Sequence, residues 1–255
     1  YFRNEKDEGL LYSSSFDSNV IVWSADNFNA LFKLDYGSWV LSSTVVYLRK
    51  QYCPLAFLCG GYFKKYPIKV FNLVNGALEF EIPITENISS EIIESYIEEE
   101  GGKYFLFVGS DNCDKPRVVW YDFKTKAQLG TFPATANITS LNVEFCNKSP
   151  SIFYTDSAGV IRQGDLQTCK LVLDFRTNFP ILDLLIWDAE YFLVCGSPRD
   201  NSVKIYTRAK TRLVKTFENN HSRVICNMFK CYQPHNGACL FTVGGDRKIK
   251  LQKLF

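Results

Sequence analysis

The stretch SFDSNVIVWSAD, residues 15–26, joins a turn to a strand pattern that returns at the other end of the chain. Small residues around Asp17 favour a turn, and the apolar and polar residues after it alternate as in a half-buried strand. The stretch GGDRKIKLQKLF, residues 244–255, repeats this order around Asp246. The two stretches therefore predict a repeated structural unit.

Four further copies of this pattern lie between the two ends, one of them weak. A period of about 40 to 50 residues is typical of repeat architectures, whose units must pack on one another to bury their hydrophobic faces. Six repeats are expected, with approximate bounds 1–35, 36–83, 84–133, 134–175, 176–218 and 219–255. Each copy consists of an apolar run, a turn and a second run. The positions that align near the end of this second run are Trp23, Phe71, Tyr121, Gly164, Tyr206 and Gln252.

The pattern within a repeat is that of strands rather than helices. The second repeat has apolar runs at 39–48, 55–60, 68–72 and 77–82, which turn residues separate. Residues 89–100 also fit one face of a helix, but their place in the repeat favours an inner strand. The whole chain is therefore expected to be a single all-β domain, a β-propeller of four-stranded antiparallel blades.

The repeats resemble those of the WD40 family. Residues 15–23 match the small-x-Asp turn and the terminal Trp of that family's signature, and Asn220-His221 stand at its Gly-His position. The resemblance covers the whole chain, but the repeats are degenerate, because only His221 represents the His and only Trp23 the Trp. It implies structural roles in blade-stiffening hydrogen-bonded sets for His221, Asp246, Asp17 and Trp23, with Thr242 as a further member.

The first repeat lacks most of its inner strand, and the last lacks its outer strand. Three arrangements remain open. A longer chain with a seventh blade is favoured; the alternatives are a six-bladed ring with trimmed ends and an open ring completed by a partner's strand. The last is implied by a likeness to propellers of coat and nuclear-pore scaffolds, and open sheet edges do attract strands.

The amino-acid composition limits the classes of partner and the cellular compartment that are expected. Lys and Arg total 29 against 27 Asp and Glu, which makes a nucleic-acid partner unfavoured but still open. The 9 cysteines include no CxxC pair and are interpreted as buried free thiols of a cytoplasmic or nuclear protein. Cys59 and Cys195 align with valines in sister repeats, which favours packing roles. No apolar run approaches the roughly 18 residues of a membrane-spanning helix.

Motifs for catalysis are missing from the sequence. It has no nucleophile elbow, no phosphate-binding glycine loop and no metal-ligand spacing, and Asp183 and Asp188 have no evident partners. No cofactor, metal or small-molecule substrate is expected, and the protein is not expected to be an enzyme. A protein-interaction scaffold within a multiprotein complex is favoured; a propeller-fold enzyme and a reader of RNA or modified peptides are the alternatives.

The predicted partner-binding surface is the face that carries the loops between second and third strands and those entering the inner strands. Aromatic and cationic residues gather there, and such residues often anchor interfaces. A protein or peptide with acidic segments would suit this surface. The candidate residues are Phe63, Lys64, Lys65, Tyr66, Trp39, Arg117, Phe179, Arg199, Arg223 and Arg247, with Tyr36 beside them.

Overall fold

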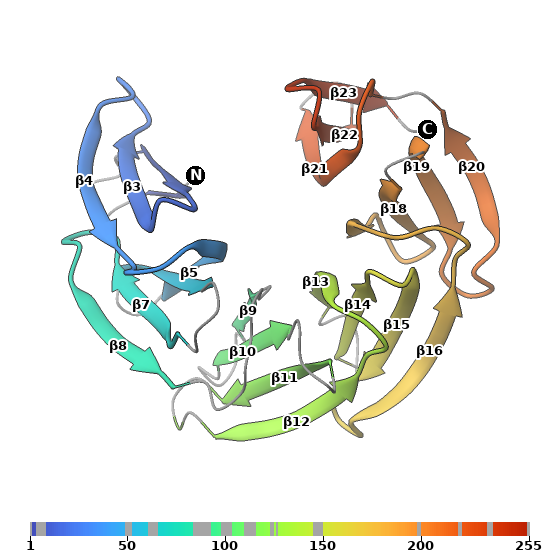
Figure 1. Ribbon diagram of the computed structural model, residues 1–255, viewed down its shortest axis with the longest axis horizontal. Helices are drawn as coiled ribbons and strands as arrows, with labels where there is room; N and C mark the ends of the chain where they lie inside the picture. The colour runs from blue at the N-terminus through green and yellow to red at the C-terminus, as the bar shows by residue number, and fades with distance from the viewer. Residues whose placement is uncertain are drawn as a thin grey trace. The chain divides into compact units, whose positions relative to one another are not determined.

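The computed structural model of the chain consists of small antiparallel sheets (Figure 1). All regular structure among the described residues is β-strand, in five four-stranded sheets and one three-stranded sheet. The all-β prediction and the β-propeller type of fold are thereby confirmed. The described residues are 2–3, 9–48, 53–60, 66–83, 93–97, 104–109, 116–122, 125, 127–144, 150–197, 200–218, 221–233 and 237–253.

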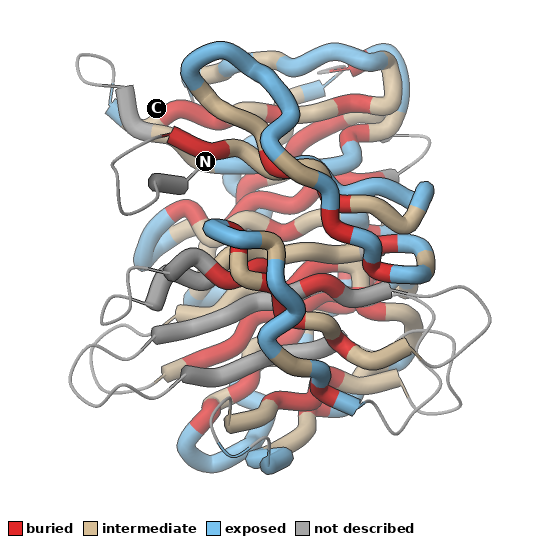
Figure 2. The backbone as a smooth tube through the Cα atoms, turned by 90° about the vertical axis from the view of Figure 1, so that its left-hand side faces the viewer, coloured by how far each residue is buried: buried red, intermediate tan, exposed pale blue. Residues whose placement is uncertain are grey.

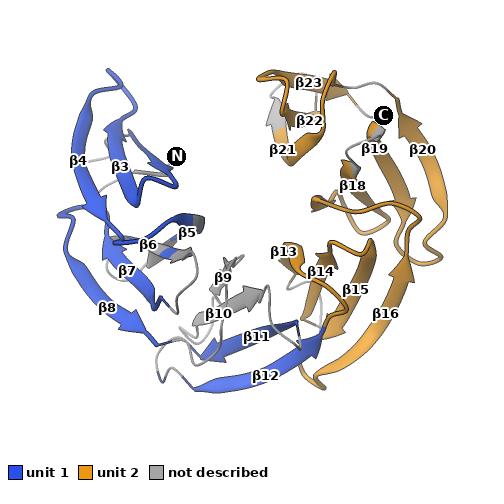
Figure 3. Cartoon of the chain, viewed as in Figure 1, with its two compact units in different colours: residues 1–133 blue, residues 134–255 orange. Residues whose placement is uncertain are grey.

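The first compact unit, residues 1–133, contains sheets 1 to 3 (Figure 3). Each is a meander in which strands pair in chain order. Successive sheets are neighbours, because β2 of sheet 1 contacts β5, the inner strand of sheet 2, and β5 contacts β9, the inner strand of sheet 3. Sheet 1 holds β1 (Phe2–Arg3), β2 (Gly9–Ser14), β3 (Asn19–Ser24) and β4 (Ala30–Asp35); sheet 2 holds β5 (Val40–Leu48), β6 (Cys53–Gly60), β7 (Ile68–Asn72) and β8 (Leu78–Ile82); sheet 3 holds β9 (Ile93–Ile97), β10 (Tyr104–Gly109), β11 (Arg117–Asp122) and β12 (Gln128–Pro133).

The second compact unit, residues 134–255, contains sheets 4 to 6. Its inner strands are likewise neighbours, β13 with β17 and β17 with β21. Sheet 4 holds β13 (Ile138–Glu144), β14 (Ser151–Asp156), β15 (Val160–Asp165) and β16 (Lys170–Arg176); sheet 5 holds β17 (Asp183–Ile186), β18 (Tyr191–Ser197), β19 (Asp200–Thr207) and β20 (Leu213–Phe217); sheet 6 holds β21 (Ile225–Gln233), β22 (Gly237–Gly244) and β23 (Ile249–Lys253).

The strands of each sheet lie within one expected repeat, except that β16 ends at Arg176, one residue beyond the fourth repeat. The ambiguous segment 89–100 contains the strand β9, so its interpretation as an inner strand is confirmed over Ile93–Ile97; its other residues lie outside the described ranges. The first sheet has an inner strand of 2 residues, and the described part of the sixth sheet has no outer strand.

The hydrophobic core lies between successive sheets of each unit. Val20 and Val22 of β3 pack with Ala56 and Leu58 of β6, so that sheet 1 covers sheet 2. The same relation holds in unit 2 between sheets 4 and 5 and between sheets 5 and 6. Figure 2 shows the result: buried stretches lie within strands, whereas the exposed ones are mostly turns and outer strands. Because side chains alternate between the two faces of a strand, one set packs against the preceding sheet and the other against the following sheet.

The cysteines follow the prediction only in part. Cys195 is buried, and its thiol donates to the carbonyl oxygen of Ile225 at 3.7 Å; Cys239 is buried as well. The interpretation as buried thiols is wrong for Cys169 and Cys226, which are exposed. Cys169 lies in the turn between β15 and β16, with a φ of 54°. The side chain of Cys59 lies outside the described part of the structure.

Candidate partner-binding site

A hydrogen-bonded network fixes the turn between β22 and β23. His221, just before β21, lies 2.9 Å through Nδ1 from Asp246 Oδ1 and 2.9 Å through Nε2 from Thr242 Oγ1. The other carboxylate oxygen of Asp246 accepts from the backbone N–H of Ser222 at 3.0 Å. His221 and Thr242 are buried, so the network ties the loop before β21 to the turn before β23.

The network also lowers the pKa of Asp246. Desolvation raises the pKa of Asp246, but hydrogen bonds from His221, Ser222 and Lys248 outweigh it and hold that pKa well below its ordinary value. Asp246 is therefore ionised and can only accept hydrogen bonds. Nδ1 of His221 therefore donates to this carboxylate, and the contact between Nε2 and the Thr242 hydroxyl completes the network.

Gly244 is required by the closeness of this packing. A Cβ atom at Gly244 would lie 2.4 Å from Nδ1 of His221, which is shorter than any real contact. The neighbouring Gly245 donates its N–H to the Val224 carbonyl at 2.8 Å and has room for a Cβ, at 3.5 Å from the nearest atom. The glycine at 244 thus allows the imidazole to approach the turn.

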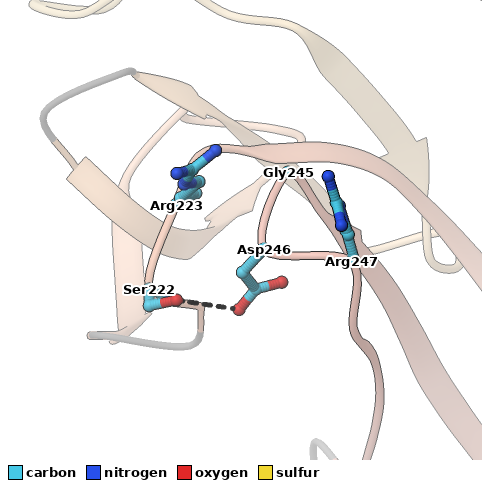
Figure 4. A pocket seen from close by; sticks show the side chains of 5 residues that line it. All are labelled: Ser222, Arg223, Gly245, Asp246 and Arg247. Atoms are coloured by element: carbon cyan, nitrogen blue, oxygen red, sulfur yellow. Dashed lines mark hydrogen bonds between the residues drawn. The ribbon is translucent and has the colours of Figure 1, made fainter.

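Two arginines stand over a depression that this turn creates. Ser222, Arg223, Gly245, Asp246 and Arg247 line a shallow pocket of about 380 Å³. Figure 4 shows Arg223 and Arg247 on either side of Gly245, with Ser222 and Asp246 joined by a hydrogen bond. Both arginines are exposed, and Arg247 has a left-handed backbone with φ of 63°. Because Asp246 is occupied by its own donors, the guanidinium groups are available to an anionic group of a ligand.

The Trp and Asp of the first repeat lie in a different, smaller arrangement in unit 1. Trp23 on β3 donates its ring N–H to Ser13 Oγ at 3.0 Å, and Asp17 accepts the N–H of Asn19 at 3.0 Å within the turn. These backbone and side-chain hydrogen bonds lower the pKa of Asp17, a fully exposed group, despite slight desolvation. Trp23 and Asp17 thus make separate hydrogen bonds in sheet 1, whereas His221, Thr242 and Asp246 form one network in sheet 6.

Unit 1 also carries an exposed aromatic pair on its loops. Phe16, in the β2–β3 turn, stacks on Trp39, in the β4–β5 loop, with ring centroids 5.3 Å apart and planes inclined by 10°. Phe16 is 59% exposed and Trp39 37%. Phe16 belongs to this surface but was missed by the sequence reasoning, although it directly precedes Asp17 in the turn. Such a preformed aromatic surface loses little conformational entropy when a partner covers it.

Two tyrosines assigned to the surface have structural roles. Tyr36 is fully buried, and its hydroxyl donates to the carbonyl oxygen of Pro67 at 3.0 Å. Tyr66 is half-buried against Tyr36, and its hydroxyl donates to the carbonyl oxygen of Gly37 at 2.8 Å. The prediction that Tyr36 is part of the surface is wrong, because the ring fills the space between sheets 1 and 2.

The other candidate residues are scattered. Arg117 is half-buried at the start of β11, and Phe179 is half-buried under the ammonium group of Lys204, which lies 4.4 Å from the ring centroid. The candidates outside the described residues are Phe63, Lys64, Lys65 and Arg199. The structure thus brings together Arg223 and Arg247 in unit 2, and it places Trp39 beside Phe16 in unit 1.

The carboxylate of Asp183, which has no evident partner in the sequence, has three hydrogen-bond donors in the structure. Asp183 on β17 accepts from Ser140 Oγ at 2.8 Å, from the N–H of Leu184 at 2.8 Å and from the N–H of Met228 at 2.7 Å. Desolvation dominates over these bonds and raises the pKa of Asp183 to about 6. Among the described residues, Asp188 accepts by contrast from the nearby backbone N–H groups of Glu190 and Tyr191.

The described residues contain no group of three His, Cys, Asp or Glu side chains that could hold a metal ion. Within the same ranges, no helix is long and apolar enough to cross a membrane. No known protein-family model matches the chain, and no curated protein is significantly similar to it.

Proposed function

We propose that the chain is a non-catalytic β-propeller of the WD40 type that acts as a protein-interaction scaffold in a multiprotein complex. In this proposal the six sheets are six blades, and a seventh blade, trimmed ends or a partner's strand accounts for the incomplete first and last repeats. The five free cysteines among the described residues suit the reducing cytoplasm or nucleus.

The observation that carries the proposal is the pair Arg223 and Arg247 over the pocket of sheet 6. The turn beneath them is held by a buried network, so the two guanidinium groups are presented from a rigid base. Arginine forms strong paired hydrogen bonds with carboxylates, so an acidic segment of a protein is the ligand that the pocket suits. The stacked Phe16 and Trp39 supply a second, apolar contact surface on unit 1.

The proposal is tested by quantitative affinity purification of the wild-type protein and an Arg223→Ala/Arg247→Ala variant from a cell extract, with identification by mass spectrometry. The expected result is that specific partners are lost from the variant while its thermal unfolding is unchanged. Lys210→Ala/Arg212→Ala provides a matched control, because it removes two exposed cations from the β19–β20 turn. If both variants retain every partner, or lose the same ones, the arginine pocket is not the binding site.

A further inference from the structure

The side chains of Arg223 and Arg247 have no acceptor within the part of the chain that the structure describes. Both are exposed, and no hydrogen bond or ion pair joins either guanidinium group to another described residue. Asp246 lines the same pocket, but its carboxylate already accepts from the imidazole of His221 and from the backbone N–H groups of Ser222 and Lys248. An anion that satisfies the two guanidinium groups therefore has to come from a ligand.

Arg208 on β19 shows how much of a carboxylate one arginine uses. Its Nη1 and Nη2 atoms donate to the two carboxylate oxygens of Glu144, at 3.1 and 2.6 Å. This paired geometry is usual for arginine and a carboxylate, and it engages both oxygens of the acid. A carboxylate bound in this way by one arginine of the pocket would offer only its remaining lone pairs to the other arginine.

A phosphate monoester has the acceptors that two arginines require. It has three terminal oxygens and carries a charge of about −1.5 to −2 at pH 7. It can therefore accept hydrogen bonds from both guanidinium groups at once, and clusters of arginine are a common means of recognising phosphorylated residues. An exposed pair of one arginine and one carboxylate contributes little by comparison, because water screens both charges.

The segments that form the pocket carry an excess of positive charge. Residues 221–224 and 244–250 contain four cations, Arg223, Arg247, Lys248 and Lys250, and one acid, Asp246. Without His221, the formal charge of these segments is therefore 4 − 1 = +3. A group with two negative charges is attracted to such a surface more strongly than a single carboxylate is.

The base of the pocket leaves room for an anionic group between the two arginines. Gly245 lies between them and has no side chain (Figure 4), and even an added Cβ would have no neighbour closer than 3.5 Å. The turn is held in place by the buried His221 and Thr242. A ligand group can therefore approach both guanidinium groups without reorganising the turn, which lowers the cost of binding.

We propose that the pocket of sheet 6 binds a phosphorylated serine or threonine of a partner protein, with the phosphate group between Arg223 and Arg247. Both guanidinium groups donate to its oxygens, so a kinase and a phosphatase that act on the partner control its attachment. This inference rests on the proposed function, because it specifies the ligand of the same pocket. An acidic segment without phosphate would satisfy the proposed function and contradict this inference.

The test measures binding of three fluorescent libraries of short peptides to the full 255-residue chain by fluorescence anisotropy. The libraries have the same degenerate flanking positions and differ only in the central residue, which is phosphoserine, glutamate or serine. The phosphoserine library is expected to bind with a Kd at least about tenfold lower than that of the glutamate library, because a dianion engages both arginines. The serine library is not expected to bind.

Arg223→Ala/Arg247→Ala should raise the Kd of the phosphoserine library by at least about tenfold. Arg223→Lys/Arg247→Lys should also raise it, by a smaller factor, because lysine keeps the charge but lacks the planar fork of donors. Lys210→Ala/Arg212→Ala is the matched control: it removes two exposed cations from the β19–β20 turn and should leave this Kd unchanged. The thermal unfolding of all three variants should match that of the wild type, because the substituted side chains are exposed.

The outcomes separate this inference from the proposed function. If the glutamate library binds as tightly as the phosphoserine library and both lose affinity in Arg223→Ala/Arg247→Ala, the inference is overturned and the pocket remains a site for acidic segments. If no library responds to the arginine substitutions, neither proposal about the pocket holds.

Two further probes identify the source of the phosphate. Inorganic phosphate and phosphatidylcholine vesicles that contain phosphatidylinositol phosphate are titrated against the same wild-type protein and the same Arg223→Ala/Arg247→Ala variant. The phosphoserine library is expected to bind more tightly than either. Equally tight, arginine-dependent binding of free phosphate or of the vesicles would overturn the assignment to a phosphorylated partner protein.

Discussion

The hydroxyl of Ser140 on β13 donates to the carboxylate of Asp183 on β17, across 2.8 Å. The second oxygen of the same carboxylate accepts the backbone N–H of Met228 on β21. One side chain therefore joins the inner strands of sheets 4, 5 and 6. These hydrogen bonds have a structural role: the described donors around Asp183 are one hydroxyl and two backbone amides, and they connect the three strands.

Asp183→Asn is expected to destabilise the protein by about 1–3 kcal/mol. An amide can accept at only one of its two terminal atoms, so either Met228 or the Ser140 and Leu184 donors lose their acceptor in a buried place. Urea unfolding at pH 7 measures the change in free energy. Glu190→Gln, an exposed carboxylate in the turn before β18, is the control and should change it by less than about 0.5 kcal/mol. Equal effects of the two substitutions on the free energy of unfolding would contradict a stabilising role for the hydrogen bonds of Asp183.

The raised pKa of Asp183 predicts an unusual pH dependence. With a pKa of about 6 in the folded protein and 3.8 as the ordinary value, the folded state binds more protons between these two values. The contribution of Asp183 to stability therefore falls as the pH rises from about 4 to about 6, opposite to an ordinary ion-paired aspartate. Wild type should gain stability over Asp183→Asn when the pH is lowered from 7 to 5. A difference that stays constant or shrinks on acidification would contradict this.

Thr242→Val tests the network beneath the arginine pocket. Valine has the shape of threonine but no hydroxyl, so Nε2 of His221 would be left without its partner at a buried site. The expected loss is about 1–3 kcal/mol of unfolding free energy. Chemical denaturation measures it, and the exposed Thr168→Val in the β15–β16 turn is the comparison. An unfolding free energy of Thr242→Val equal to that of the wild type would contradict a stabilising role for this hydrogen bond.

Gly244→Ala is expected to be far more damaging than Gly245→Ala. The new methyl group at 244 would lie 2.4 Å from the His221 ring, whereas at 245 its nearest neighbour is 3.5 Å away. Gly244→Ala must displace the imidazole and so break its bond to Asp246. Differential scanning calorimetry should show a lower Tm for Gly244→Ala alone. Equal melting temperatures for both variants would mean that the turn does not require the imidazole in place.

The buried pair Arg162 and Asp156 in sheet 4 predicts a large effect from a single substitution. Their charged atoms are 2.8 Å apart, and both side chains are almost fully buried. Arg162→Met should cost about 3–5 kcal/mol, because it leaves the Asp156 carboxylate buried without its cation.

Asp174 provides the matched control for that substitution. It faces the same guanidinium at 3.5 Å, but its side chain is 56% exposed. Asp174→Asn should therefore cost no more than about 1 kcal/mol. Urea unfolding of both variants distinguishes a buried pair from a solvated one, and comparable losses would show that burial of Asp156 does not decide the result.

Features that recur along the chain could be predicted from the sequence. The alternation in residues 15–26 and 244–255 reflects the side-chain period of a strand, and the 42- to 50-residue spacing reflects one sheet per repeat. The proximity of His221 and Asp246 followed from the resemblance rather than from the residues themselves. Individual surface residues were harder: Tyr36 and Trp39 lie three residues apart, yet one is fully buried and the other exposed.

By itself the sequence determined the strands, the turns and the repeat, because these depend on the preferences of neighbouring residues and on local periodicity. Only the tertiary structure decided which side chains from different strands meet. Asp183 accepts hydrogen bonds from Ser140 and Met228, each more than 40 residues away in the sequence, and Val203 of β19 is buried against residues of sheet 6. Burial, partner geometry and the resulting pKa depend on neighbouring strands, which a linear pattern does not encode.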